Sequence, residues 1–309
     1  MVAQLDEAFP DSTPLPAWRT DRSTGRWSGG GVRCSLSGYP GRMAGEPRPE
    51  DVYDRARGEG ERRLSMSALE QASTGFIAGV TIVFGIVALG VARELVAPDY
   101  ASGVGQLIGA LAFGIGLVFV VVGRTELFTE NFFDPVAAAI ARRRASAAGQ
   151  LARLWFLVLL LNFVGGAVMA AVFAVRGTLP GRAHETLVLV AEEIAAKGGL
   201  ATFTRGIAAG TLLTLLSYLL HAVGSTGSRI ALAYVVGFFL ALGPFDHVVV
   251  SGLHLLFGIW LGAHVSYADL GLNVVLAGAG NLVGGLLLMT LTHAVQARGA
   301  RRLPARSDM

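Results

Sequence analysis

Long apolar segments of this chain are separated by short polar segments. Six apolar stretches follow a polar region that ends near residue 64, and each approaches or exceeds the roughly 20 residues that cross a bilayer as a helix. They cover residues 75–92, 104–122, 154–175, 206–223, 230–263 and 270–290. The pattern predicts an all-α polytopic membrane protein with six transmembrane helices.

Polar residues interrupt the second and the fifth stretch. Gly123–Asn131 follows the second stretch before a short apolar continuation over residues 132–140, and Gly243–His247 divides the fifth. Glycine and proline break helices, and charged groups at membrane depth are tolerated only inside protein or beside a water-filled path. The breaks therefore indicate a transport pathway. A proline kink with a core histidine would explain Gly243–His247 equally well on its own.

A repeated motif follows each break. Asn162–Gly166 reads NFVGG and Asn281–Gly285 reads NLVGG, and the first lies 33 positions after Thr129 and the second 34 positions after His247. Three helices fit in each half, so the halves must be inverted relative to each other. Inverted repeats with matching broken helices place a substrate path near the membrane midplane. The simpler interpretation of either motif is small-residue helix packing at these positions: Asn162, Gly165, Asn281 and Gly284.

Composition and charge refine this picture. The chain is 53% hydrophobic and only 15% charged, with a mean hydropathy of +0.56, which excludes an ordinary soluble domain. Arginines gather before the first stretch, between the second and third, between the fourth and fifth, and after the sixth. Because positive residues favour cytoplasmic loops, both termini are predicted to lie in the cytoplasm, with the protein in a bacterial inner membrane.

The chain ends are predicted to be tails. Residues 1–64 form a disordered cytoplasmic N-terminal tail, residues 65–296 the channel domain, and residues 297–309 a short basic C-terminal tail. The single cysteine, Cys34, permits no internal disulfide or cysteine-based metal site. His247 and His254 lie seven residues apart without a third ligand, so no metal or cofactor is expected. Neither enzymatic activity nor a nucleic-acid partner is predicted.

Several residues near the breaks could act on a solute. The Thr129 hydroxyl can donate to an anion or bond to His247 across a pore, and His247 can exchange a proton near neutral pH. Half-helix N-termini at a break favour anions. Other polar candidates for the substrate path are Glu126, Asp246, Lys197 and Arg124. Candidates for apolar constrictions, or alternatively for plain helix packing, are Leu117, Leu127, Phe128, Leu213 and Leu240.

Together and in this order, five motifs of the chain resemble the formate/nitrite transporter family. They are Glu126–Thr129 with Asn131, Asn162–Gly165, Arg205–Ile207, Phe245–His247 and Gly280–Gly285, spread through residues 65–296. The resemblance implies an aquaporin-like fold of six helices, assembled as a homopentamer with one pore per protomer. It also implies that small monocarboxylates or nitrite are the substrates.

The resemblance assigns roles to single residues. His247 matches the central pore histidine of the family and Thr129 the hydroxyl that faces it, while the five apolar candidates fall near its two constrictions. Lys197 is an approximate counterpart of its vestibule lysine. The departures are Arg124, Pro244 and Gly210, and the wording GRxELFTEN is closer to a poorly characterised inner-membrane branch of the family.

The sequence therefore predicts a channel or proton-coupled carrier for a small weak-acid anion, with proton transfer at His247. Its partners would be the anion, protons, the lipid bilayer and copies of itself. Two other classes of function stay open. One is a pH-independent channel for a neutral solute, in which His247 only orients hydrogen bonds. The other is a non-transporting scaffold or sensor that works through the N-terminal tail.

Overall fold

The computed structural model describes residues 19–21, 26–28, 47–96, 102–142 and 144–301. The chain divides into two compact units, residues 1–45 and 46–309. In the first, β1 (Arg19–Asp21) and β2 (Arg26–Ser28) pair as antiparallel strands. Apart from these strands, the predicted disorder of the first 46 residues concerns positions outside the described residues. Residues 302–309 of the predicted C-terminal tail also lie outside them.

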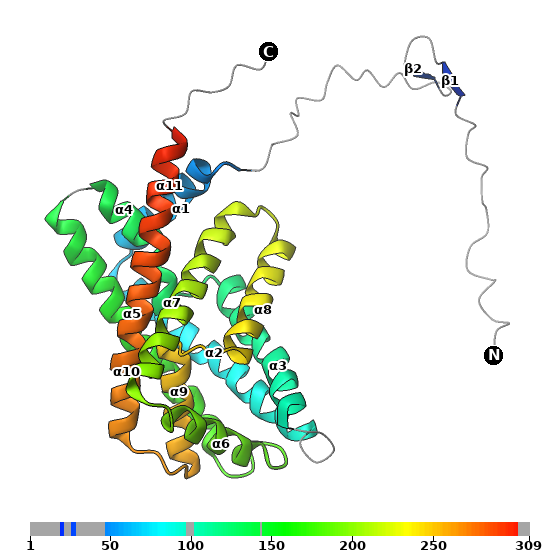
Figure 1. Cartoon of the computed structure of the whole chain (residues 1–309), viewed down its shortest axis with the longest axis vertical. Helices are drawn as coiled ribbons and strands as arrows, with labels where there is room; N and C mark the ends of the chain where they lie inside the picture. The colour runs from blue at the N-terminus through cyan, green and yellow to red at the C-terminus, as the bar shows by residue number, and fades with distance from the viewer. Residues whose placement is uncertain (1–18, 22–25, 29–46, 97–101, 143, 302–309) are drawn as a thin grey trace. The chain divides into compact units, whose positions relative to one another are not determined.

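In the described part of the second unit, all regular secondary structure is helical (Figure 1). Its five long apolar helices are α2 (Ala68–Val96), α3 (Ser102–Val122), α5 (Ala145–Ala174), α7 (Gly199–Ala222) and α10 (Tyr267–Leu282) with its continuation. That continuation is the π-helical η3 (Val283–Thr290) and then α11 (Leu291–Arg301). The shorter helices are α1 (Pro49–Ser65), α4 (Asp134–Arg142), α6 (Ala183–Ala195), α8 (Thr226–Leu242) and α9 (Val248–Leu261), with a 3₁₀ turn η2 (Phe128–Phe132).

The predicted interruptions are confirmed. Helix α3 ends at Val122, and the chain then passes through an irregular segment and η2 before α4 begins. Helix α8 ends at Leu242 and α9 begins at Val248, so Gly243–His247 lies between two apolar helices of 17 and 14 residues. Each of these two is too short to cross a bilayer alone.

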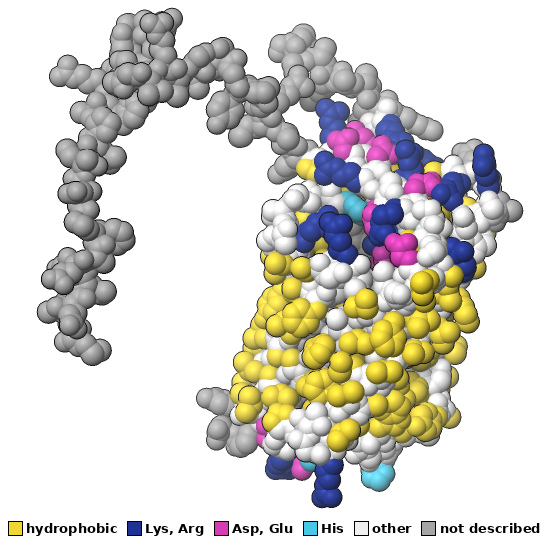
Figure 2. All heavy atoms as spheres, turned by 180° about the vertical axis from the view of Figure 1, so that it is seen from behind, with side chains coloured by type: hydrophobic (Ala, Val, Ile, Leu, Met, Phe, Trp, Pro, Cys, Tyr) yellow, Lys and Arg dark blue, Asp and Glu magenta, His cyan; other side chains and the backbone are white. Residues whose placement is uncertain are grey.

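Side chains sort by type along the second unit. On the face drawn in Figure 2, hydrophobic side chains form a band, and charged side chains lie beyond it at both ends, most of them at the upper end. Helices α1, α4 and α11 lie toward the upper end (Figure 1). Exposed apolar side chains of the unit include Phe156, Val168 and Val172 of α5. Such a band suits lipid or neighbouring subunits rather than water.

Helix α1 corrects the predicted boundary of the N-terminal tail. Residues 49–64 were expected to be disordered, yet they form a helix whose Val52, Tyr53 and Ala56 are buried. Acidic residues occupy its first turn and Arg62 and Arg63 its last, which suits the helix dipole. Contacts with α4 and α11 hold α1 against the channel domain. The prediction is therefore wrong for this segment, because polar composition hid a narrow buried face.

Close backbone contacts join α2 to α5, and α7 to η3, the continuation of α10. A Cβ atom on Gly165 would lie 2.0 Å from the carbonyl oxygen of Phe76, and one on Gly284 would lie 2.0 Å from that of Ile207. No side chain fits at either position unless the helices separate. The two halves of the chain thus pack their first and third helices through equivalent glycines.

Candidate functional site

Asn162 holds the first break in place. Its Nδ2 donates to the carbonyl oxygens of Gly75 on α2 and Glu126 in the break, at 2.8 and 2.9 Å. Its Oδ1 accepts the backbone N–H of Phe128 at 2.9 Å. The amide therefore satisfies backbone groups that the interrupted helix leaves open, which lipid could not do.

Asn281 makes the same set of bonds in the second break. Its Nδ2 donates to the carbonyl oxygens of Gly206 on α7 and Asp246, at 2.8 and 2.9 Å, and its Oδ1 accepts from the N–H of Val248 at 3.0 Å. The repeated NxVGG motifs thus mark two inverted copies of one structure. Helix packing alone, the simpler interpretation of the motifs, does not account for these three bonds.

Thr129 and His247 meet between the two breaks. Thr129 Oγ1 lies 2.6 Å from His247 Nε2, and the two residues are 0% and 1% exposed. His247 Nδ1 accepts the backbone N–H of Val250 at 3.2 Å, so in the neutral ring the proton is on Nε2. Nε2–H therefore donates to the Thr129 oxygen, and the hydroxyl hydrogen of Thr129 can point to a third group.

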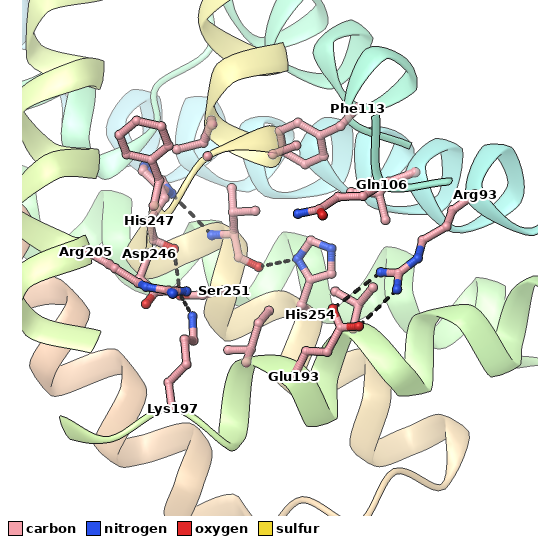
Figure 3. Close-up of a pocket in the computed structure, with 18 residues that line it drawn as sticks. Arg93, Gln106, Phe113, Glu193, Lys197, Arg205, Asp246, His247, Ser251 and His254 are labelled. Carbon is pink, nitrogen blue, oxygen red and sulfur yellow. Dashed lines mark hydrogen bonds and ion pairs between the residues drawn. The ribbon is translucent and has the colours of Figure 1, made fainter. Parts of the chain in front are cut away.

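A first cavity, of about 170 Å³, opens beside His247. Its polar lining comes from α2, α3, α6, α7, α9 and the second break, as Figure 3 shows. Lys197 Nζ forms an ion pair with Asp246 Oδ1, and Arg93 pairs with Glu193 at 2.9 Å. Arg205 is the third cation of the lining. Three cations thus face two carboxylates.

Lys197, a candidate for the substrate path, has a carboxylate partner. The structure brings it together with Asp246, as two candidate residues of one cavity. Burial lowers the pKa of the Lys197 ammonium and nearby Arg205 lowers it further, whereas Asp246 opposes both effects. Its charge is therefore largely balanced by a partner, whereas Arg205 forms no ion pair with a described residue.

A second cavity, of about 480 Å³, lies against α1 and the first break. Arg63 of α1 reaches Glu126 Oε1 at 3.1 Å and Asp134 Oδ2 at 3.6 Å, and donates to the carbonyl oxygen of Glu130 at 3.0 Å. Arg124 also lines this cavity, in a left-handed backbone conformation with φ of 53°. Arg124 and Lys197 therefore face different cavities. Arginines and carboxylates line the second in equal numbers: Arg55, Arg62, Arg63, Arg124, Arg229, and Glu59, Glu70, Glu126, Glu130, Asp134.

The five apolar candidates lie in one buried cluster: Leu117, Leu127, Phe128, Leu213 and Leu240. Leu240 also lines the first cavity. Phe128 packs edge-on against Phe132 and Trp155, with ring centroids 4.8 and 6.3 Å apart. The Thr129–His247 pair is thus surrounded by apolar side chains between two polar cavities, of which His247 lines the first and the neighbours of Thr129 the second.

Three residues of the site were missed in the sequence. Phe113 lines the first cavity one turn before Leu117, and that i, i+4 spacing was a usable signal. Arg63 was interpreted only as a topological anchor, although it precedes the first helix of its half as Lys197 precedes the fourth helix. His254 was considered only as a metal ligand, yet it lines the first cavity.

Two proteins of known sequence are similar to this chain over most of its length. Over 80% of its length the chain is 25% identical to the inner membrane protein YfdC of Escherichia coli, covering 78% of that protein. It is 27% identical to the uncharacterized transporter YrhG of Bacillus subtilis, over 80% of this chain and 92% of that one. The GRxELFTEN wording had indicated such a poorly characterised inner-membrane branch, and this prediction is confirmed.

Solved structures share the fold. An ion channel of the FNT family superimposes with a TM-score of 0.69 at 21% identity, over 79% of this chain and 98% of that one. A pentameric formate channel with formate bound gives a TM-score of 0.64 at 20% identity, over 74% and 96%. The family model of the formate/nitrite transporters matches residues 50–295, which include α1. The chain belongs to the formate/nitrite transporter family.

Proposed function

We propose that the protein is a channel or carrier for small monovalent weak acids of the formate or nitrite type. The observation that carries the proposal is the buried Thr129–His247 hydrogen bond between two polar cavities. Helices α8 and α9 together form the fifth of six crossings of the bilayer. Membership in a family of transporters and the fold shared with a formate-bound channel support this assignment.

The acid crosses the apolar centre in its neutral form. A bare anion in a buried apolar cluster costs several kcal/mol or more unless it is paired. The site offers only hydroxyl and imidazole groups at its centre, whereas its cations line the cavities. A neutral acid can accept from the Thr129 hydroxyl without carrying charge through the cluster.

His247 acts in this geometry as a neutral hydrogen-bond donor. To take a second proton, Nδ1 must release the backbone N–H of Val250, since two donors cannot face each other. To give up its Nε2 proton alone, the ring would become an imidazolate. We therefore place protonation of the substrate in the cavity before the pair, and give His247 and Thr129 the task of passing the neutral acid.

Flux measurements on reconstituted protein test this proposal. Liposomes are loaded with a panel of small acids, with and without a pH gradient, and compared with protein-free liposomes. Flux should rise as pH falls, because the neutral fraction of each acid increases. His247→Phe should abolish or sharply reduce uptake while the oligomer stays intact. Undiminished flux in that variant at acidic and neutral pH would contradict the proposal.

A channel for a neutral small solute is the second candidate, and the fixed tautomer of His247 favours it. Such a channel would pass its solute equally at all pH values and carry no proton-linked signal. The same liposomes separate the two functions when uncharged solutes of similar size are included.

The assembly and its setting follow from the same comparison. We propose a homopentamer in a bacterial inner membrane, with both termini in the cytoplasm. The exposed apolar band and the pentameric relative support the assembly. The mass of the detergent-solubilised complex, corrected for bound detergent, tests the number of subunits. Labelling of single cysteines placed at each end of the domain tests the orientation.

A further inference from the structure

His254 presents an unpaired nitrogen to the first cavity. It lies on α9 two turns after His247 and is only 5% exposed. Its Nδ1 lies 2.9 Å from the carbonyl oxygen of Val250, which can only accept, so Nδ1 carries a proton. In the neutral ring Nε2 is therefore an acceptor, and within the described part of the chain no group donates to it.

None of the described residues around His254 donates to Nε2, although the Gln106 amide lines the same cavity. Figure 3 shows Gln106, Arg93 and Glu193 on one side of the cavity and Lys197, Arg205 and Asp246 on the other. Arg93 is engaged by Glu193, and Lys197 by Asp246. Asp246 Oδ2 is a second buried acceptor without a donor among the described residues. The cavity thus has hydrogen-bond acceptors to spare, together with one cation, Arg205, that forms no ion pair with a described residue.

This arrangement selects a particular chemical form of ligand. A carboxylate or nitrite anion has no hydrogen to give to His254 Nε2 or Asp246 Oδ2, whereas the neutral acid has one O–H. The other oxygen of the same acid can accept from Arg205. A polar cavity of about 170 Å³ is large enough for a molecule of a few heavy atoms.

We propose that His254 Nε2 accepts the O–H of the small neutral acid and so forms a binding position ahead of the Thr129–His247 pair. This inference rests on the proposed transport of weak acids and adds the site where the protonated form is held. His247 and His254 then have different tasks: His254 accepts from the acid, whereas His247 donates to Thr129, whose hydroxyl donates to the acid.

Two substitutions of similar size test the Nε2 atom. His254→Asn keeps an amide nitrogen near the position of Nδ1, where it can still donate to Val250, but leaves nothing at Nε2. His254→Gln places an amide atom near Nε2. We expect the half-saturating acid concentration for flux to rise about 3- to 10-fold in the Asn variant, as for loss of one hydrogen bond. The Gln variant should recover most of that loss, with the maximal rate changed less than the half-saturating concentration.

Nitrogen NMR of the imidazole rings supplies a readout without transport. In protein labelled with ¹⁵N-histidine, formate added at acidic pH should shift the Nε2 resonance that disappears in His254→Gln. Sodium chloride at the same ionic strength should leave it in place. The shift is measured on the wild-type oligomer, and either substitution removes the His254 resonance. One variant that assembles is therefore sufficient to assign it.

The outcomes separate this inference from the proposed function. One outcome is that acids are transported, both variants behave as wild type and formate leaves the resonance unmoved. The His254 inference is then overturned, because no acid binds at Nε2, whereas the proposed function stands. Equal loss of flux in both variants, with the resonance unmoved, would assign His254 a structural role and also overturn it. If wild-type protein moves no acid, the proposed function fails, and a formate-dependent shift would then show binding without transport.

Discussion

The break in the first half of the chain and the break in the second place equivalent backbone atoms in equivalent positions. Glu126 and Asp246 each give their carbonyl oxygen to an asparagine, and each carboxylate pairs with a cation that precedes the first helix of its half. The residue that follows differs: it is Leu127 in one break and His247 in the other. The asparagine bonds keep the backbone of both breaks in the same non-helical conformation. The two breaks differ in the side chains that this backbone carries.

The cations differ as well. Arg63 sits on α1 among three acidic residues and is fixed by several contacts, whereas Lys197 has one partner at the edge of a cavity. The first break is therefore tied to α1 by several ionic contacts, whereas the second borders the first cavity with a single ion pair. This contrast indicates that the two cavities have different tasks, and four experiments can break or sharpen it.

The largest effect is expected from making the second break resemble the first. His247→Leu copies the residue at the equivalent position and removes the donor to Thr129. Acid flux should fall at least about tenfold, since the substrate loses the polar pair in the apolar centre. Flux in liposomes measures it, and Thr129→Val, which removes the same bond from the other side, should show a comparable loss. Wild-type flux in both variants would remove the pair from the mechanism.

Equal and large losses of stability are expected when either asparagine is altered. Asn162→Asp and Asn281→Asp keep the side-chain shape but replace a double donor with an acceptor facing two carbonyl oxygens. Each should cost roughly 2–4 kcal/mol, because buried carbonyl groups lose their donors. Thermal unfolding of the detergent-solubilised oligomer measures both. A large effect in only one half would show that the frame is not shared.

The two ion pairs should differ in their contribution to stability. Arg63→Met leaves Glu126 and Asp134 buried without their main cation, which costs about 3–5 kcal/mol in such settings. Lys197→Met should cost less, since Asp246 borders a cavity that admits water. Lys197→Met should instead raise the half-saturating acid concentration. Thermal unfolding measures the stability loss in each variant, and flux measures the half-saturating concentration. A larger stability loss for Lys197→Met than for Arg63→Met would contradict the expected difference between the two ion pairs.

The smallest effect concerns α1 and pH. Burial would raise the pKa of the Glu59 carboxyl, but Arg62 and Arg63 outweigh it and hold that pKa below its usual range. Arg62 and Arg63 lie on the same helix as Glu59, so these ion pairs stabilise α1 itself. Since the folded-state pKa is lowered, that contribution is complete above the ordinary glutamate pKa and is lost as pH falls through the lowered value. Hydrogen exchange in α1 should therefore accelerate only at strongly acidic pH. Glu59→Gln, which lacks the charge, should show faster exchange at neutral pH and little further change.

Much of the fold could be predicted because it follows from apolar length and helix breaks. The all-α class, both interruptions, and the meeting of Thr129 with His247 followed from position in the chain and from the family resemblance. The docking of α1 could not be seen, since Arg and Glu dominate its composition and its buried face is only a few residues wide. The pairing of Lys197 with Asp246 spans 49 positions, and sequence spacing carries no information about such a contact.

The hydrogen-bond direction at His254 was also out of reach. A histidine on an apolar helix face reveals neither its tautomer nor the carbonyl that fixes it, and both came from the contact with Val250.

Gly210 is a residue whose sequence signal pointed to the substrate but whose structure points to packing. Its departure from the family pattern raised doubt about the substrate, yet a Cβ there would lie 2.1 Å from the carbonyl oxygen of Asn281. The close contact between these two helices is sufficient to explain why a glycine occupies position 210.

The paired asparagines also affect which side chains of the protein can change during evolution. Because each fixes its break through main-chain atoms, the side chains within the break are free to change without a new backbone. A duplicated ancestor with two identical breaks could acquire a histidine in one copy and a threonine in the other by single substitutions. Relatives with other substrates can then arise by exchange at these few positions, while the scaffold stays constant.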